Sequence, residues 1–459
     1  MVDAADLKSA GVILVGSSPS PGTNLLSKEI NPENNDLSTT RWNLCGSELL
    51  LLELKNIGKI FHRWGGAPAT FFTYTHFTHD LLVSVLIPVL PLIRASLGLS
   101  YLQAGLLVSA YTITTGFSQI PMGWLGDRTS RRVVVAIGLT GVSVAAIAIG
   151  LSPAYYPMLA LLIIQGVFAG AYHPSATSML SGHFDSVQRG KVLGFHLLGG
   201  SIGFATAPIL GGIIGDMLGW RYAFIILSIP ALISVPLVLK KFRLSQSIDN
   251  SQLTEETLSN APIKAVPKLA SLAKVLKPIA AITALAVLTQ LIIGSMIAFI
   301  PLYLVDKHGL LAAYAAILIS VIRGGGMIGT LLGGWLSDKW GRKKVILLAV
   351  SAVGPVVYLL TILPFNAALI VIFILFGMFM MMRQPAVQTM IMDAVSPRLR
   401  ATAIGIYLFL SMEGVSMAQP VVGYFMDIWG IVQVFHVIGL ISIGLSVMAI
   451  LWAVRMRLT

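Results

Sequence analysis

Histidine and aspartate side chains inside one apolar segment have the spacing of a proton-binding group. His76, His79 and Asp80 fall within about one helical turn, and His76 and Asp80 are four residues apart, so a helix would place those two on one face. Burial of a carboxyl group favours its protonated form, and histidine titrates near neutrality. Asp80 is therefore the expected proton-carrying carboxylate, with a histidine as relay. The alternative is that Asp80 only pairs with a buried base.

Further ionisable residues lie in other apolar segments: His173, Arg323, Arg383 and Glu413. Arginine stays charged, and its planar guanidinium suits a carboxylate or phosphate, so Arg323 and Arg383 are expected to bind an anionic group. Glu413 could instead neutralise Arg323 as a brace between helices. His173 could relay protons, or it could only bond to carbonyl groups freed by the neighbouring Pro174.

The segments that carry these residues are long enough to cross a lipid bilayer. The 459 residues are 56% hydrophobic and only 11% charged, and the mean hydropathy is +0.84. A helix needs about 20 apolar residues to span the hydrocarbon core. We predict an all-α integral membrane protein with twelve transmembrane helices near 69–94, 102–123, 132–151, 156–180, 191–215, 221–240, 278–304, 313–337, 344–363, 366–391, 400–426 and 431–454.

The chain contains an internal duplication. The stretch 123–132 returns at 334–343, and the offset from Asp127 to Asp338 is 338 − 127 = 211 residues. The same offset carries Gly219 onto Gly430. One register that survives over so many positions indicates two copies of a six-helix unit. We predict a cytoplasmic N-terminal extension at 1–65 that is mostly disordered, a first bundle at 66–240, a cytoplasmic linker at 241–277 and a second bundle at 278–459.

Basic residues concentrate in the loops on one side of the predicted bundles. The positive-inside rule places this side and both termini in the cytoplasm, so the net charge of +12 needs no nucleic acid partner. Cys45 is the single cysteine, which excludes an intrachain disulfide framework and a cysteine-based metal site. We expect no metal and no cofactor. Residues 47–61 could form a helix on the membrane surface, or the true start could lie further downstream.

Two six-span halves joined by a long polar loop resemble the major facilitator superfamily. The loop between spans 2 and 3 is similar to the family signature glycine-x-leucine-x-aspartate followed by glycine-arginine-arginine; Ser130 replaces the second glycine in the first copy, and Gly341 keeps it in the second. The resemblance implies transport by rocking of the two halves. It assigns a gating role to Gly123, Asp127, Arg128, Arg131, Arg132, Gly334, Asp338, Gly341, Arg342 and Lys343. The alternative is that the basic residues only fix the topology.

Span 5 resembles the antiporter motif of drug-efflux members, although Ala207 replaces the glycine before its proline. The alternative is a packing seam without bearing on direction. The matching positions are Gly194, Gly203, Pro208 and Gly211. The first half also resembles the fosmidomycin-resistance-like branch through 76–80, 99–105 and 173–174.

The leading expectation is a secondary transporter that exports a drug-like or anionic compound by proton coupling. Proton-coupled uptake of an organic anion is the alternative, and a sensor that kept the fold is a third reading. No glycine-rich phosphate loop and no catalytic constellation is present in the sequence, which argues against an ATP-driven pump and an enzyme. The expected partners are a small solute, protons and lipid, for a monomer in the plasma or inner membrane.

Overall fold

The computed structural model describes residues 66–184, 186–241, 269–395 and 400–455, and these are almost entirely helical. The predicted extension at 1–65 and most of the predicted linker lie outside the described residues. Ten helical segments are long and apolar enough to cross a membrane. Together with α5 and α17 they make the twelve crossings that the sequence predicts. The first half holds α3 (Gly66–Val83), α4 (Leu86–Leu97), α5 (Tyr101–Arg128), α6 (Arg131–Gly150), α7 (Tyr155–Gly182), α8 (Ser186–Leu218) and α9 (Trp220–Lys241).

The second half repeats this order, and its first helix begins earlier than predicted. Helix α12 starts at Leu269 rather than at 278, so it is longer than the bilayer needs. The helices are α12 (Leu269–Ile297), α13 (Ile300–His308), α14 (Ala312–Trp340), α15 (Arg342–Ile362), α16 (Ala367–Ala394), α17 (Arg400–Trp429) and α18 (Ile431–Arg455).

The first crossing of each half is a broken helix where the sequence predicts one continuous span. The break between α3 and α4 falls at Ser84–Val85, and the break between α12 and α13 falls at Ala298–Phe299. Pro88 and Pro301 follow the breaks, and proline cannot donate the backbone hydrogen bond to the residue four positions earlier. Matching breaks in the two halves are typical of a binding site between the repeats of a transporter.

Backbone conformation repeats with the same offset of 211 residues. Gly98 and Gly309 end α4 and α13 with φ of 61° and 64°, and Gly219 and Gly430 have φ of 99° and 84°. Such positive values favour glycine. Where the family signature has a second glycine, Gly341 has a φ of 94°. Ser130 at the matching place has a φ of −80°, so the first copy adopts an ordinary backbone there.

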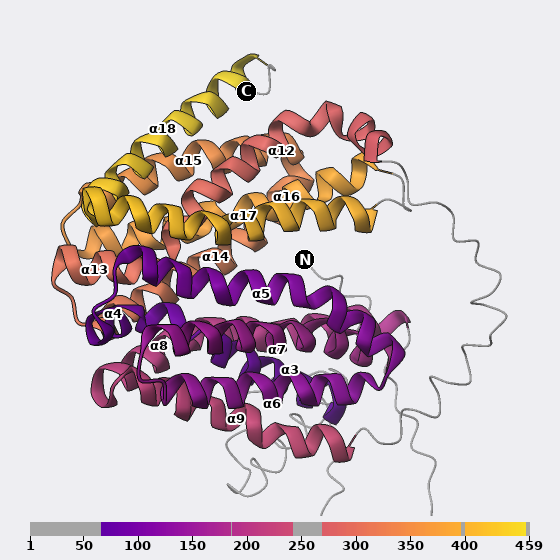
Figure 1. Cartoon of the computed structure of the whole chain (residues 1–459). Helices are drawn as coiled ribbons and strands as arrows, with labels where there is room; N and C mark the ends of the chain where they lie inside the picture. The colour runs from indigo at the N-terminus through magenta and orange to yellow at the C-terminus, as the bar shows by residue number, and fades with distance from the viewer. Residues whose placement is uncertain (1–65, 185, 242–268, 396–399, 456–459) are drawn as a thin grey trace, which may run out of the picture. The chain divides into compact units, whose positions relative to one another are not determined.

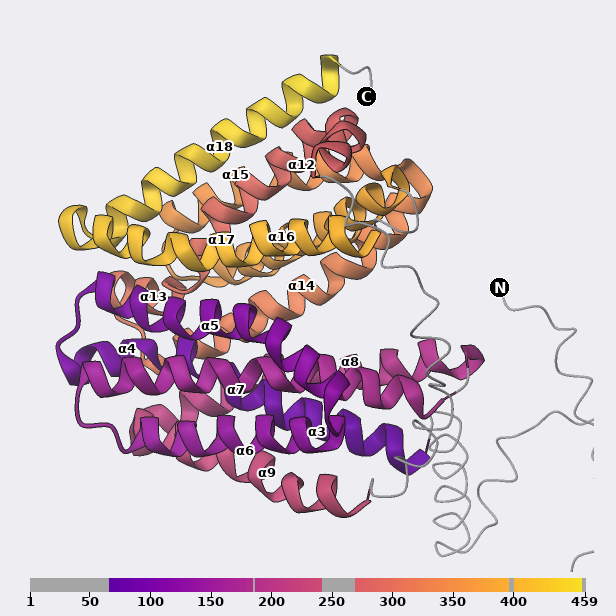
Figure 2. The same ribbon diagram turned by 45° about the vertical axis from the view of Figure 1, so that its right-hand side comes forward.

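The halves contact each other along α5 with α17 and α8 with α14 (Figures 1 and 2). We call the end with the 129–130 and 341 turns the motif end and the end with Gly98 and Gly309 the far end. Helices α4 and α13 contact each other at the far end. Toward the motif end, large side chains of both halves are exposed: Ile120, Trp124, Leu331 and Trp335. This conformation is therefore closed at the far end.

Helices α5 and α17 are the two crossings that are not among the ten most apolar segments. They are 28 and 30 residues long, so their length is sufficient. Ser109 of α5 donates to the Ser416 carbonyl of α17, and it lies 3.4 Å from the Gln419 amide oxygen. Their polar residues are thus buried against the other half rather than against lipid, which explains their lower hydropathy.

Candidate functional site

Three helices of the first half bring five ionisable side chains together. We call His76, His79 and Asp80 of α3, His173 of α7 and His196 of α8 the His–Asp cluster. The two α3 histidines and Asp80 are buried, as is His196, whereas 37% of the His173 side chain is exposed. The sequence predicted four of these residues. His196 was missed, although a histidine within an apolar span is itself a signal.

Asp80 is the centre of the cluster. Its Oδ2 lies 3.2 Å from Nε2 of His76, and its Oδ1 lies 2.8 Å from Nδ1 of His79. Nε2 of His173 lies 3.7 Å from Oδ1. The rings also contact each other, since His76 stacks on His196 with centroids 4.3 Å apart and His173 meets His79 edge-on at 4.9 Å. One carboxylate therefore faces three imidazole rings.

The backbone partners of the histidines determine where protons lie. Nδ1 of His76 lies 2.9 Å from the His196 carbonyl oxygen, which can only accept, so Nδ1 must donate. A neutral His76 would then present an unprotonated Nε2 to the Oδ2 of Asp80, and two acceptors would face each other at 3.2 Å. A proton between them removes this repulsion. A neutral histidine and an ionised aspartate have no proton between Nε2 and Oδ2. The geometry of the His76–Asp80 pair therefore allows one additional proton to bind there.

The Asp80 carboxylate and the His76 ring lie against glycines of α8. A Cβ atom on Gly200 would lie 2.5 Å from Nε2 of His76 and 2.6 Å from Oδ2 of Asp80. A Cβ atom on Gly203 would lie 2.5 Å from the Phe77 carbonyl, and one on Gly211 2.8 Å from the Val85 side chain. The antiporter-like glycines at these two places are thus packing contacts with α3 and with the break that follows it.

Two other positions of that motif have different surroundings. Gly194 has no atom within 4 Å of its Cβ position, so its glycine is not required by packing in this conformation. Pro208 lies inside α8.

Tyr172 encloses the cluster from the α7 side. Its ring stacks on His79 with centroids 4.5 Å apart, and its hydroxyl lies 2.8 Å from the Thr75 hydroxyl. His173 follows directly in α7, and its partial exposure makes it the member that water or a solute can reach. Since the side chain faces Asp80 as well, its predicted role as a proton relay remains available, and Pro174 does not have to be its reason for being there.

The arginines belong to helices of the second half, whereas the His–Asp cluster belongs to helices of the first half. Arg383 of α16 is buried and donates from Nη2 to the Gln290 amide oxygen of α12. Its Nε is buried without a hydrogen-bond partner, and no described carboxylate forms an ion pair with it. Arg323 of α14 lies over the Phe204 ring of α8, with Cζ 5.4 Å from the centroid. Arg323 is thus placed where the halves meet.

The suggested brace between Arg323 and Glu413 is wrong for the described residues. Glu413 belongs to α17 and lies against Gly116 of α5, where a Cβ atom would lie within 1.7 Å of its Oε1. Its Oε2 is buried and has no partner. The reason is geometric: α14 packs on α8 and α17 packs on α5, so the two side chains belong to different contacts between the halves.

The gating motifs form ion pairs within each copy. Asp127 pairs with Arg131 at 3.3 Å, and Asp338 pairs with Arg342 at 2.8 Å, each across the turn to the next span. Arg342 also lies 3.4 Å from Asp393 of α16. Among the described residues, neither carboxylate reaches the other half. In this state the two motif carboxylates therefore make their described ion pairs within their own half.

The donor atoms of His76, Asp80 and His173 lie within 4.8 Å of one another. A divalent cation could bridge atoms at this spacing, whereas a shared proton needs the shorter 3.2 Å separation of His76 and Asp80. From the sequence we expect no metal, and the three residues are expected there as proton-pathway residues.

Solved structures with the same architecture are membrane transporters. A bacterial homolog of the human lysosomal transporter Spinster has a TM-score of 0.68 at 17% identity, covering 83% of this chain and 96% of that chain. The nucleoside transporter NupG has a TM-score of 0.69 at 15% identity, covering 84% and 98%. At such identities the likeness concerns the fold.

Sequence comparison also gives transport and export proteins. The chain is 27% identical to the D-galactonate transporter of Escherichia coli O6:H1 over 265 residues, or 55% of this chain and 62% of that protein. It is 30% identical to the tetracenomycin C resistance and export protein of Streptomyces glaucescens over 138 residues, which are 30% of this chain and 25% of that protein. The matches thus span less than two thirds of either relative.

These proteins are transport or export proteins, which confirms the prediction that the chain is not an enzyme. The model of the Major Facilitator Superfamily matches residues 72–418 and 328–458. The chain therefore belongs to the Major Facilitator Superfamily.

Proposed function

We propose that the chain is a proton-coupled secondary transporter that moves a small organic anion by alternating access. The observation that carries this proposal is the distance of 3.2 Å between Nε2 of His76 and Oδ2 of Asp80 in a buried site, where a proton would join the two atoms. Proton loading there changes the charge of the His–Asp cluster, and charge inside a membrane protein is costly enough to shift an equilibrium between two conformations.

Arg383 supports the choice of an anion. A buried guanidinium with a neutral glutamine partner and a free Nε is an uncompensated charge, which an anionic ligand would neutralise. Three relatives transport small anions according to their names: the D-galactonate transporter, a hexose phosphate transport protein of Chlamydia trachomatis and a phosphoglycerate transporter of Salmonella typhimurium. A carboxylate or phosphate compound is the substrate class that fits.

The charges of the two sites support symport. His173 is the partly exposed member of the His–Asp cluster, so a proton bound there adds positive charge where water reaches the cluster. This charge attracts an anion held by Arg383, so proton and anion each favour binding of the other. Exchange would instead need the two to compete for one site.

In this proposal the motif end, where Arg128, Arg131 and Arg342 lie, faces the cytoplasm of a monomer in the cell membrane. Labelling of Ser130→Cys with a membrane-impermeant thiol reagent, in a Cys45→Ser background, checks this orientation. Labelling in everted vesicles and protection in intact cells is the expected pattern.

Flux into proteoliposomes tests the coupling. With D-galactonate and 3-phosphoglycerate as probes and an imposed pH gradient, the wild type should accumulate at least one of them. Asp80→Asn should lose gradient-driven accumulation and keep counterflow, because the amide retains the volume and cannot exchange a proton. Equal loss of both activities would reject Asp80 as the coupling residue.

Drug efflux is the second candidate. Besides the tetracenomycin C exporter, the puromycin resistance protein of Streptomyces alboniger matches at 28% identity over 147 residues. The same vesicles distinguish the two functions. Proton-driven movement of puromycin opposite to the proton flux, without transport of the anions, would favour efflux.

A further inference from the structure

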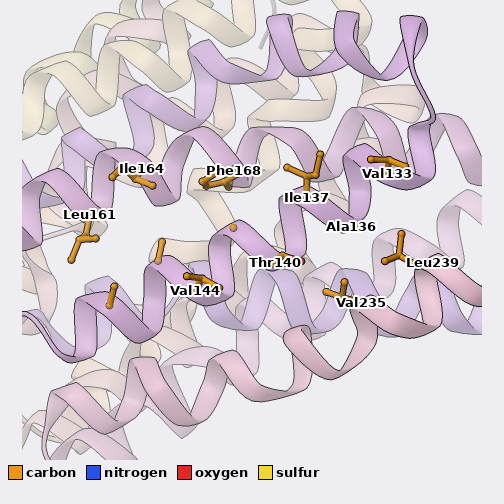
Figure 3. A pocket seen from close by; sticks show the side chains of 13 residues that line it. Val133, Ala136, Ile137, Thr140, Val144, Leu161, Ile164, Phe168, Val235 and Leu239 are labelled. Carbon is orange, nitrogen blue, oxygen red and sulfur yellow. The ribbon is translucent and has the colours of Figure 1, made fainter.

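A groove lies on the side of the first half that faces away from the second half. It is formed by α6, α7 and α9 and encloses about 540 Å³ (Figure 3). None of the residues of the His–Asp cluster lines it. Its side chains are apolar except for the hydroxyl of Thr140. The lining residues are Val133, Ala136, Ile137, Thr140, Gly141, Val144, Ala145, Ala148, Leu161, Ile164, Phe168, Val235 and Leu239.

Helix α9 packs on α6 on both sides of the groove, and near the far end the two helices approach closely. There a Cβ atom on Gly150 would lie 2.7 Å from the backbone of α9. Further along, α9 contains Pro230 and Pro236, which interrupt its hydrogen bonds and bend it. The matching helix α18 has no internal proline, and Gly354 of α15 packs against it with a Cβ position 2.2 Å from its backbone. At Gly354 the matching pair α15 and α18 is therefore in close backbone contact.

Basic residues lie at the motif end of the groove. Arg132 precedes the lining residue Val133, and the exposed Lys240 follows the lining residue Leu239. Nη1 of Arg132 donates to the Leu239 carbonyl at 3.3 Å, while its Nε is buried without a partner. From Val133 to Ala148 a helix rises about 22 Å, which exceeds the ~15 Å of one hydrocarbon leaflet. The apolar groove is thus longer than one leaflet, and Arg132 and Lys240 are adjacent in sequence to its lining residues at the motif end.

We propose that this groove binds one anionic phospholipid. One acyl chain lies along α6 between α7 and α9, and the phosphate lies between Arg132 and Lys240. Hydrocarbon is the only abundant material at that depth in a bilayer, and it suits a lining that offers one hydroxyl. The two cations complement the charge of the headgroup, and the unpartnered Nε of Arg132 is a free donor for a phosphate oxygen.

Native mass spectrometry of the purified full-length protein tests the site. The protein is incubated in detergent with phosphatidylglycerol or phosphatidylcholine of equal chain length, and the fraction that retains one lipid is measured. The wild type should retain more phosphatidylglycerol, and the preference should fall by roughly fivefold for each charge removed in Arg132→Gln and Lys240→Gln. Val144→Trp, which fills the groove, should lower retention of both lipids.

Matched variants separate this site from general surface effects. Lys343→Gln/Lys344→Gln removes two charges at the motif end of the second half, and Val437→Trp enlarges an exposed side chain of α18; both should retain lipid as the wild type does. Glycerol 3-phosphate should not displace phosphatidylglycerol, because it lacks acyl chains. The proposal would be overturned by equal retention of phosphatidylglycerol and phosphatidylcholine in the wild type. It would also be overturned if either control variant lost as much lipid as the groove variants, or if glycerol 3-phosphate displaced phosphatidylglycerol.

Discussion

At the scale of single residues, the chemistry depends on which buried polar atoms have partners. In the first half, Asp80 has three histidines around one carboxylate. In the second half, Arg383 has a single glutamine and a free Nε. A carboxylate with several hydrogen-bond partners can pass a proton to one of them, whereas a buried donor without a hydrogen-bond partner is available to bind a ligand. The two halves therefore hold different parts of the proposed mechanism.

The role of Arg383 is tested by Arg383→Gln. A hydrogen bond to a charged group contributes about 1.5–3 kcal/mol, so we expect the KM for the transported anion to rise roughly 10- to 100-fold. Arg383→Lys keeps the charge and loses the forked geometry, so its KM should lie between that of the wild type and that of Arg383→Gln. Initial-rate flux in proteoliposomes gives these values. An unchanged KM for the anion would remove Arg383 from the binding site.

At the scale of elements, the packing of α8 on α3 determines the geometry of the His–Asp cluster. Glycine on α8 is required where the helix approaches the buried carboxylate, at Gly200, and not where its surface is open, at Gly194. Two glycines of the antiporter-like motif, Gly203 and Gly211, also have a local physical reason in this chain: they let span 5 pack against the broken span 1. This reason is independent of the direction of transport.

Gly200→Ala tests this packing. The added methyl group has to displace His76 or Asp80, which should cost about 1–3 kcal/mol and abolish proton-driven accumulation. Gly194→Ala is the matched control. It adds the same methyl group into open space and should be neutral or stabilising by up to about 1 kcal/mol. Thermal unfolding of the purified variants, together with flux, measures both effects. Equal behaviour of the two variants would contradict the role of Gly200.

At the scale of the whole molecule, a clasp between the halves closes the far end. The carboxylate of Asp427, on α17, accepts from the backbone N–H of Tyr101 at 2.7 Å and of Leu102 at 2.9 Å, and so caps the start of α5 in the other half. Arg94 pairs with Asp306 of α13 at 3.3 Å beside it. Since these bonds join the halves, they have to break before the far end opens.

Asp427→Asn should weaken the clasp by about 0.5–2 kcal/mol, because an amide offers one acceptor and no charge to a helix N-terminus. Spin labels at Leu151 and Leu311, which are exposed at the far end of each half, should then show a larger population at long separation. Asp216→Asn is the repeat-matched control, since Asp216 is exposed and its carboxylate has no partner among the described residues. A shift of equal size in both variants would contradict the clasp.

The sequence by itself determined the twelve crossings, the duplication and the pair of His76 and Asp80. Hydropathy over about 20 residues and a four-residue spacing are local properties, and the bilayer converts them directly into helices and helix faces. Tertiary structure decided the rest: which histidines join Asp80, why α8 needs Gly200, and that Glu413 meets Gly116 instead of Arg323. These are contacts between helices, and a bilayer that solvates every apolar face alike leaves helix pairing to close packing and polar partners, which a linear pattern does not record.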